Sequence, residues 1–182
     1  MTAFENWMNI KVDPQWKKTG WSYSVPAPTV FDEAMKIVHN GQPLTGEALK
    51  EVARPEGSPI HAIANWNEHE NSEAYLNHHF ASVIGALRMV VVTEEVCEEP
   101  KKEIPIFVNV IHEGVRQYMP TQTVARDKNL MRQAIEKALT DFERLNNRYE
   151  MLTELGGLRS SVDREIKVIK AGLTTQDPAP MQ

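Results

Sequence analysis

The chain has 182 residues and a hydrophobic content of 41%, which suits one folded domain with extended arms and a core that needs no covalent cross-links. Its net charge of −5 excludes a global basic field that would attract nucleic acid or an anionic membrane. The single cysteine, Cys97, excludes an intramolecular disulfide, and the glutamates around it disfavour the reactive thiolate.

Residues 1–28 are expected to form an extended arm, because aromatic residues and prolines mix there without helical or strand periodicity. Three of the four tryptophans lie in this arm: Trp7, Trp16 and Trp21. Their apolar area is too large for a free tail. We therefore expect the arm to pack on its own body or on a neighbouring copy.

Two short helices are predicted after the arm. Thr29 can cap the first, which should end at Asn40-Gly41, and Thr45 can cap the second. Leu44 and Leu49 have the spacing of a hydrophobic staple at the start of the second helix. The pair has the pattern of a generic helical hairpin and also of half a helix-turn-helix unit.

A long helix is predicted near residues 68–88, because Asn67 and Glu70 have the spacing of a capping box. Its apolar residues are spaced four, three, four and three: Leu76, Phe80, Val83, Leu87 and Val90. This spacing places them in one stripe along the helix.

A small three-stranded antiparallel meander is predicted next. Its strands come from the β-branched runs 89–93, 104–112 and 115–119, and Glu113-Gly114 supplies a turn. Both faces of the second strand are largely apolar, so a helix should cover the sheet on at least one side.

A second long helix is predicted near residues 128–155, with Asp127 as its N-cap and Gly156-Gly157 as its stop. Seven apolar residues on it follow a strict four-three spacing: Met131, Ile135, Ala138, Phe142, Leu145, Tyr149 and Leu152. Such a stripe is the seam that a coiled coil buries. It can pack on the stripe of the first long helix or on another subunit, and the spacing leaves both arrangements open.

A last amphipathic helix is expected from about Ser160 to Ala171, with Val162, Ile166 and Ile169 on one face and Gly172 at its end. The expected fold class is α+β, mainly helical, with the meander between the two long helices. Three parts are expected along the chain: the aromatic arm (1–28), a helical α+β domain (29–172) and a flexible tail (173–182).

Candidate catalytic chemistry is sparse. The histidines and carboxylates that cluster in the sequence are His61, His69, His78 and His79 with Glu68, Glu70 and Glu73. His69 and Glu73 have a spacing that can chelate a metal, but no second motif completes a shell, and capping or solvated roles are the alternative. No phosphate loop, nucleophile elbow or paired-carboxylate motif is recognisable, so we expect neither an enzyme nor a cofactor.

Basic residues gather in two places that could contact nucleic acid. In the arm, lysines alternate with aromatic residues, a pairing that suits stacking on bases and neutralising phosphates: Lys11, Lys17 and Lys18 with Trp16 and Trp21. The last helix carries the second group: Arg159, Arg164, Lys167 and Lys170. The alternative is a solvated helix face and an arm that packs on protein.

Several strings resemble a pattern in phage and prophage proteins of unassigned function. That pattern is a Ser-Pro-Leu-His turn, a Trp-Asp-Asp cap and an Ala-Ala-x-x-Tyr-Arg helix. The similar strings here span residues 53–61, 65–68, 74–81, 118–121 and 142–149, within a resemblance that covers residues 22–155. Asn67-Glu68 replaces the acidic cap and Tyr75-Leu76 replaces Tyr-Arg, so no role for that arginine is carried over. The resemblance implies phage origin and no activity.

The resulting interpretation is a non-enzymatic phage protein that self-associates through its helices and contacts a protein or nucleic-acid partner. The start of the chain lacks a signal-like segment and no apolar run approaches the roughly 20 residues that span a bilayer, so we expect the host cytoplasm and no membrane contact. One alternative is a small virion or DNA-packaging component, with the arm and tail as clasps between subunits. Another is a metal-dependent enzyme built on the histidine cluster.

Overall fold

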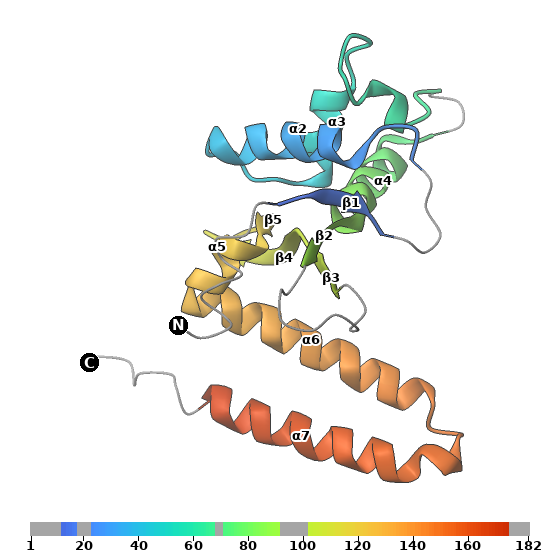
Figure 1. Cartoon of the computed structure of the whole chain (residues 1–182), viewed down its shortest axis with the longest axis vertical. Helices are drawn as coiled ribbons and strands as arrows, with labels where there is room; N and C mark the ends of the chain where they lie inside the picture. Colours follow the sequence, from blue (N-terminus) through green and yellow to red (C-terminus); the bar gives the residue numbers. More distant parts are fainter. Residues whose placement is uncertain (1–11, 18–22, 68–70, 92–101, 175–182) are drawn as a thin grey trace, which may run out of the picture. The chain divides into compact units, whose positions relative to one another are not determined.

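The computed structural model describes residues 12–17, 23–67, 71–91 and 102–174 (Figure 1). The chain divides into two compact units, Met1–Arg126 and Asp127–Gln182, and each is described by itself. The first unit combines helices with two small antiparallel sheets, and the second is a helical hairpin. None of the helices in the described part of the chain is both long and apolar enough to cross a bilayer. The α+β class predicted from the sequence agrees with this content of helices and sheets.

The first short helix, α2 (Ala27–His39), begins slightly earlier than predicted. Pro28 lies in its first turn, where the fixed φ of proline fits a helix and its missing N–H costs nothing. The helix ends where expected, because Gly41 has a φ of 71° and donates its N–H to the carbonyl of Val38. The N–H of Gln42 reaches the carbonyl of Ile37, which completes a Schellman motif.

The second short helix, α3 (Gly46–Ala53), has the predicted cap and staple. The hydroxyl oxygen of Thr45 accepts a hydrogen bond from the amide of Ala48 at 3.0 Å. Leu44 and Leu49 are both fully buried on the core side of this turn.

The first long helix, α4 (Glu73–Ala86), begins later than predicted. Ser72, not Asn67, is its N-cap, and the Ser72 hydroxyl accepts a hydrogen bond from the amide of Tyr75 at 3.3 Å. Asn67 instead donates its amide N–H to the side chain of Asn65, within a polar turn that precedes the helix. The predicted capping box at Asn67 is therefore wrong.

The apolar stripe of α4 is buried inside the first unit. Phe80 and Val83 on α4 are inaccessible to solvent, and so is Leu87, which follows the end of the helix because α4 stops earlier than predicted. All three belong to one core cluster with residues of α2 and α3. At Gly46 the helices α3 and α4 touch through their backbones, because a Cβ there would overlap the Asn77 carbonyl oxygen and lie 2.8 Å from the Ala81 amide nitrogen.

The predicted meander is divided between two sheets. The first sheet has the order β1-β2-β3, and the second is a β4–β5 hairpin. Their strands are β1 (Pro14–Trp16), β2 (Leu87–Val91), β3 (Lys102–Pro105), β4 (Phe107–His112) and β5 (Val115–Pro120). Ile106 separates β3 from β4, because its N–H bonds the Leu87 carbonyl while its own carbonyl accepts from Thr121. The predicted turn is confirmed: Glu113 and Gly114 have φ values of 51° and 78°, as a tight hairpin requires.

Part of the predicted arm is a strand. Trp16 lies on β1, donates its indole N–H to the Val25 carbonyl at 3.0 Å and packs against the ring of Tyr23. Trp16 therefore packs within the first unit. Trp7 and Trp21 lie outside the described residues.

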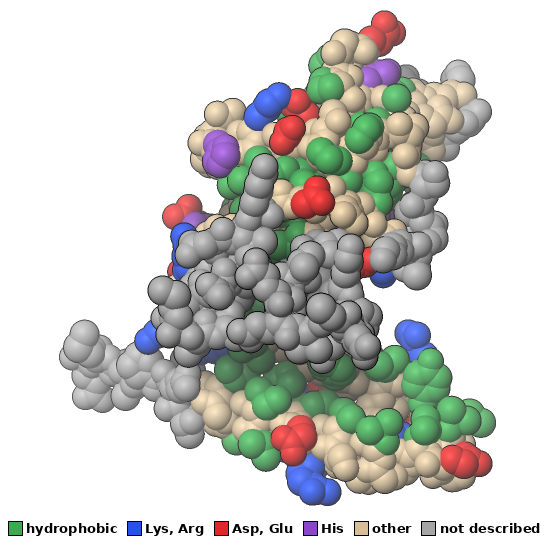
Figure 2. Space-filling model, viewed as in Figure 1, with side chains coloured by type: hydrophobic (Ala, Val, Ile, Leu, Met, Phe, Trp, Pro, Cys, Tyr) green, Lys and Arg blue, Asp and Glu red, His purple; other side chains and the backbone are tan. Residues whose placement is uncertain are grey.

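The second unit consists of α6 (Lys128–Arg148) and α7 (Gly156–Thr174), and the short helix α5 (Thr121–Arg126) precedes it. Asp127 caps α6 as predicted, since its carboxylate accepts from the amides of Asn129 and Leu130 at 2.8 and 3.0 Å. The predicted end of α6 is wrong, because Gly156 and Gly157 begin α7 in ordinary helical conformation. Gly172 likewise lies inside α7. Hydrophobic side chains are visible along the hairpin and around its turn (Figure 2).

Phe80→Ala should lower the free energy of unfolding by about 3–5 kcal/mol, because it empties a fully buried site in the first unit. The matched control is Phe142→Ala, whose ring is 56% exposed and should contribute far less to the stability of a single chain. Urea denaturation at low protein concentration measures both. Equal losses would contradict the assignment of Phe80 to the core.

Gly46→Ala should destabilise the protein by about 1–3 kcal/mol, because the added methyl group would force α3 and α4 apart. Gly85→Ala is the control: it lies in α4 with open space around its Cβ position, and alanine should stabilise this helix by up to about 1 kcal/mol. Thermal melting distinguishes the two. A neutral Gly46→Ala variant would show that the two backbones are not in contact.

Candidate functional site

Several polar contacts join the two helices of the α6–α7 hairpin. The buried side-chain amide of Asn146 donates to the carboxylate of Asp163 at 2.6 Å, and Arg159 donates to the Asn146 carbonyl at 3.2 Å. Lys170 and Glu143 form an ion pair at 2.6 Å. The buried apolar residues of these helices in the described part of the chain are Leu130 and Leu139 on α6 and Ile166 on α7. These contacts define an interhelical line along each helix.

The predicted apolar stripe of α6 lies just before this line. Phe142 precedes Glu143, and Leu145 precedes Asn146. One residue corresponds to about 100° around a helix, so the stripe faces roughly at right angles to the direction of α7. Phe142 and Leu145 are accordingly 56% and 48% exposed.

The same offset occurs on α7. Its interhelical line includes Arg159, Asp163 and Lys170, and the residue before each one is apolar: Leu158, Val162 and Ile169. Two antiparallel helices that carry the same rotational offset present their stripes on the same side of the pair. The stripes of α6 and α7 thus combine into one surface.

We call this surface the apolar face. It consists of Phe142, Leu145 and Tyr149 from the α6 side and Leu158, Val162 and Ile169 from the α7 side. At the turn it is followed by further exposed apolar side chains: Met151, Leu152 and Leu155. Met151 is 92% exposed. Isolated exposed apolar residues are ordinary, but a contiguous face of this kind marks an interaction surface.

The predicted seam residues are only partly brought together. Met131 and Ile135 are half-buried on α6, while Phe142 and Leu145 contribute to the apolar face. Tyr149 and Leu152 lie beyond the end of α6, in the segment that turns toward α7. The sequence reasoning missed Met151, Leu155 and Leu158. Apolar residues are closely spaced between residues 151 and 158, which is the pattern that could have indicated them. The pattern was not interpreted as an exposed turn because α6 was expected to continue to residue 155.

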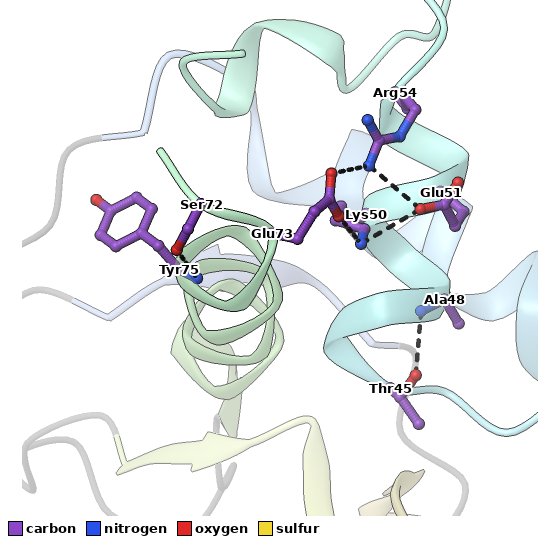
Figure 3. A network of polar contacts seen from close by, with 8 residues as sticks. All are labelled: Thr45, Ala48, Lys50, Glu51, Arg54, Ser72, Glu73 and Tyr75. Carbon is purple, nitrogen blue, oxygen red and sulfur yellow. Dashed lines mark hydrogen bonds and ion pairs between the residues drawn. The ribbon is translucent and has the colours of Figure 1, made fainter. Parts of the chain in front are cut away.

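A network of charged side chains joins α3 and α4 (Figure 3). Lys50 is only 4% exposed, and its ammonium group lies 2.5 Å from one oxygen of Glu73 and 3.3 Å from Glu51. Arg54 binds the second oxygen of Glu73 at 2.7 Å and also lies over the ring of Trp66. The network connects the last turn of α3 to the first turn of α4.

The charges in this network stabilise one another. Hydrogen bonds from Lys50 and Arg54 hold the pKa of the Glu73 carboxyl below its ordinary value. The bond to Glu73 likewise raises the pKa of the Lys50 ammonium, although burial acts in the opposite direction. Since these charges are paired within the network, we interpret it as a structural clamp.

The histidines of the predicted cluster have separate structural partners. His61 bonds the Ala53 carbonyl and stacks on Trp66, and His79 bonds the Ile63 carbonyl. His78 lies near the Ser82 hydroxyl at 3.4 Å. His69, Glu68 and Glu70 lie outside the described residues. Within the ranges that the structure describes, no three His, Cys, Asp or Glu side chains come together as metal ligands.

The predicted nucleic-acid residues are divided between the two units of the chain. Trp16 is engaged in the core of the first unit, and the neighbouring Lys17 is exposed. Lys11, Lys18 and Trp21 lie outside the described residues. On α7, Arg159 and Lys170 belong to the interhelical line, whereas Arg164 and Lys167 are exposed.

No match to the chain was found among protein-family models, curated proteins or solved structures. The functional argument therefore rests on the features of the described structure. Its leading feature is the apolar face, because the polar network and the described histidines are already explained by the stability of the first unit.

Glu73→Gln should lower the melting temperature, because it leaves the buried ammonium of Lys50 without its nearest carboxylate. The folded-state pKa of Glu73 is depressed, so its contribution is complete above the ordinary glutamate range and is lost as the pH falls. The difference from the natural protein should therefore shrink between about pH 6 and pH 3. Glu51→Gln, at a longer contact, is the control and should have the smaller effect. A difference that is independent of pH would contradict the clamp.

Proposed function

We propose that this chain is a non-enzymatic phage protein that acts by self-association through the apolar face of the α6–α7 hairpin. The phage origin rests on the sequence resemblance. The observation that carries the self-association is the exposure of Phe142, Leu145 and Leu158 on one side of the hairpin.

The energetics favour a covered face. Apolar surface gains roughly 25 cal/mol for each Å² removed from water, and monomeric proteins rarely expose contiguous patches above a few hundred Å². The apolar face and the turn together carry several apolar side chains that are about half exposed or more, among them Phe142, Leu158 and Met151. Leaving this area in water would therefore be unfavourable.

The spacing of the face suits another helix as its partner. The four-three rhythm of the α6 stripe is the pattern that lets side chains of one helix fit between those of a second. Helical bundles pack in the same way along their full length. A partner that presents a stripe of similar spacing would bury the face efficiently.

A nucleic-acid partner has less support. Two of the four candidate cations on α7, Arg159 and Lys170, are used to join the hairpin, and Trp16 is packed within its own unit. Binding of single strands that weakens steeply with salt would argue for that role in addition to self-association. A ring or larger assembly would favour the virion or packaging alternative.

The decisive measurement is the mass in solution by sedimentation equilibrium at micromolar concentration. We expect a multiple of 20.7 kDa for the natural protein and a single-chain mass for a Phe142→Glu, Leu145→Glu double variant. Two charged carboxylates on the apolar face would have to lose their hydration on association.

Lys137→Glu is the matched control, because it changes the net charge by the same amount at an exposed position of α6 away from the apolar face. It should retain the assembly. The circular dichroism of both variants should stay helical. A natural protein that sediments as a monomer would overturn the proposed function.

A further inference from the structure

We propose that a cleft on the first unit binds the guanidinium group of an arginine side chain that belongs to another protein. The cleft does not involve the apolar face, so this inference goes beyond the proposed function. Its volume is about 460 Å³, within the range of roughly 300–1,000 Å³ that small-ligand sites occupy. The lining side chains come from α2 and from the turn at residues 55–60, among them Asp32, Glu33, Met35, Lys36, His39 and Pro59.

Glu33 is a buried carboxylate that is only partly paired. It is 8% exposed. Lys36 donates a hydrogen bond to its Oε1 atom at 2.5 Å, but the Lys36 side chain is itself 66% exposed. Within the described part of the chain, the Oε2 atom of Glu33 accepts no hydrogen bond from the protein. A buried charge costs free energy unless it is paired, so Oε2 is an acceptor that a cationic ligand would satisfy.

The charges that line the cleft favour a cation. With His39 neutral the lining is net negative, since Asp32 and Glu33 supply two carboxylates and Lys36 supplies one ammonium group. A planar guanidinium carries N–H donors on several edges and can therefore bond both carboxylates at once. It is also more weakly hydrated than an ammonium ion, so it loses less on entering a half-enclosed site.

The apolar part of the lining suits the aliphatic stem of arginine. Met35 is half-buried on α2, and Pro59 is exposed on the neighbouring turn. Methylene groups can cover such side chains while the charged end reaches its polar partners. The cleft is open to solvent on one side, so the rest of a partner chain can continue outside it.

The turn that carries Pro59 is held in place by its own contacts. The amide of Ser58 donates to the Pro55 carbonyl at 2.8 Å, and the amide of His61 donates to the Ser58 carbonyl at 3.0 Å. Ile60, the residue after Pro59, is fully buried in the core of the first unit. Binding would therefore require little ordering of the chain, which favours a preformed site.

Binding can be measured by NMR titration of the full-length protein with N-acetyl-arginine amide, which presents the side chain as it occurs within a peptide. We expect saturable shifts at millimolar concentrations, concentrated in the backbone amides of residues 29–39 and 58–61. N-acetyl-citrulline amide has nearly the same shape without the charge and should cause none. Methylguanidinium, the head group without the stem, should bind more weakly. Equal or tighter binding of methylguanidinium would overturn the assignment to an arginine side chain.

Variants of the lining test the role of each charge. Glu33→Gln should weaken binding about tenfold or more, because it removes the buried charge and keeps the size of the side chain. Asp32→Asn, at an exposed position that does not affect the core, should also weaken it. Lys36→Met should strengthen binding, because it removes the cation that now occupies Oε1 of Glu33.

Glu47→Gln is the matched control, because it removes one negative charge at an exposed position of α3 that does not line the cleft. It should leave the affinity nearly unchanged. An absence of saturable shifts, equal binding of the citrulline compound, or an affinity that neither Glu33→Gln nor Asp32→Asn changes would overturn the proposal. Self-association is measured separately by the mass in solution and does not depend on this result.

Discussion

The surface chemistry of this protein depends on a one-residue offset in the α6–α7 hairpin. The side chains that join the helices, such as Asn146 and Asp163, come directly after the apolar residues of the two stripes. Because one residue turns a helix by about 100°, polar contacts hold the hairpin together and leave the apolar stripes on its side. Had Phe142 and Leu145 faced α7, the hairpin would be a closed pair without an evident binding surface.

In the first unit the apolar stripe is buried instead of exposed. Its apolar stripe on α4 is covered completely, and Phe80 and Val83 have no access to solvent. The close approach of α3 at Gly46 makes this possible, and the pairing of Lys50 with Glu73 connects the ends of the same two helices. Similar spacing thus produced a closed core in one unit and an open face in the other.

Features set by neighbouring residues could be predicted from the sequence. The caps at Thr45 and Asp127 and the helix end at Gly41 depend on hydrogen bonds that span only a few residues. The start of α4 could not be chosen in this way, because Asn67 and Ser72 are both good capping residues. The contact of Glu73 with Lys50, which is 23 residues distant, favours the later start.

Hydrogen bonds between residues far apart in the sequence explain why the predicted strands differ from the observed ones. β1 pairs with β2 across more than 70 residues, so no local pattern in the arm indicates a strand. Likewise the division of one predicted strand at Ile106 reflects its bonds to Leu87 and Thr121. The four-three stripe on α6, in contrast, is a property of the sequence by itself, because the helical repeat alone places those residues together. Which side of α6 meets α7 was decided only by the tertiary structure, since that depends on where the chain turns and which polar partners α7 then presents.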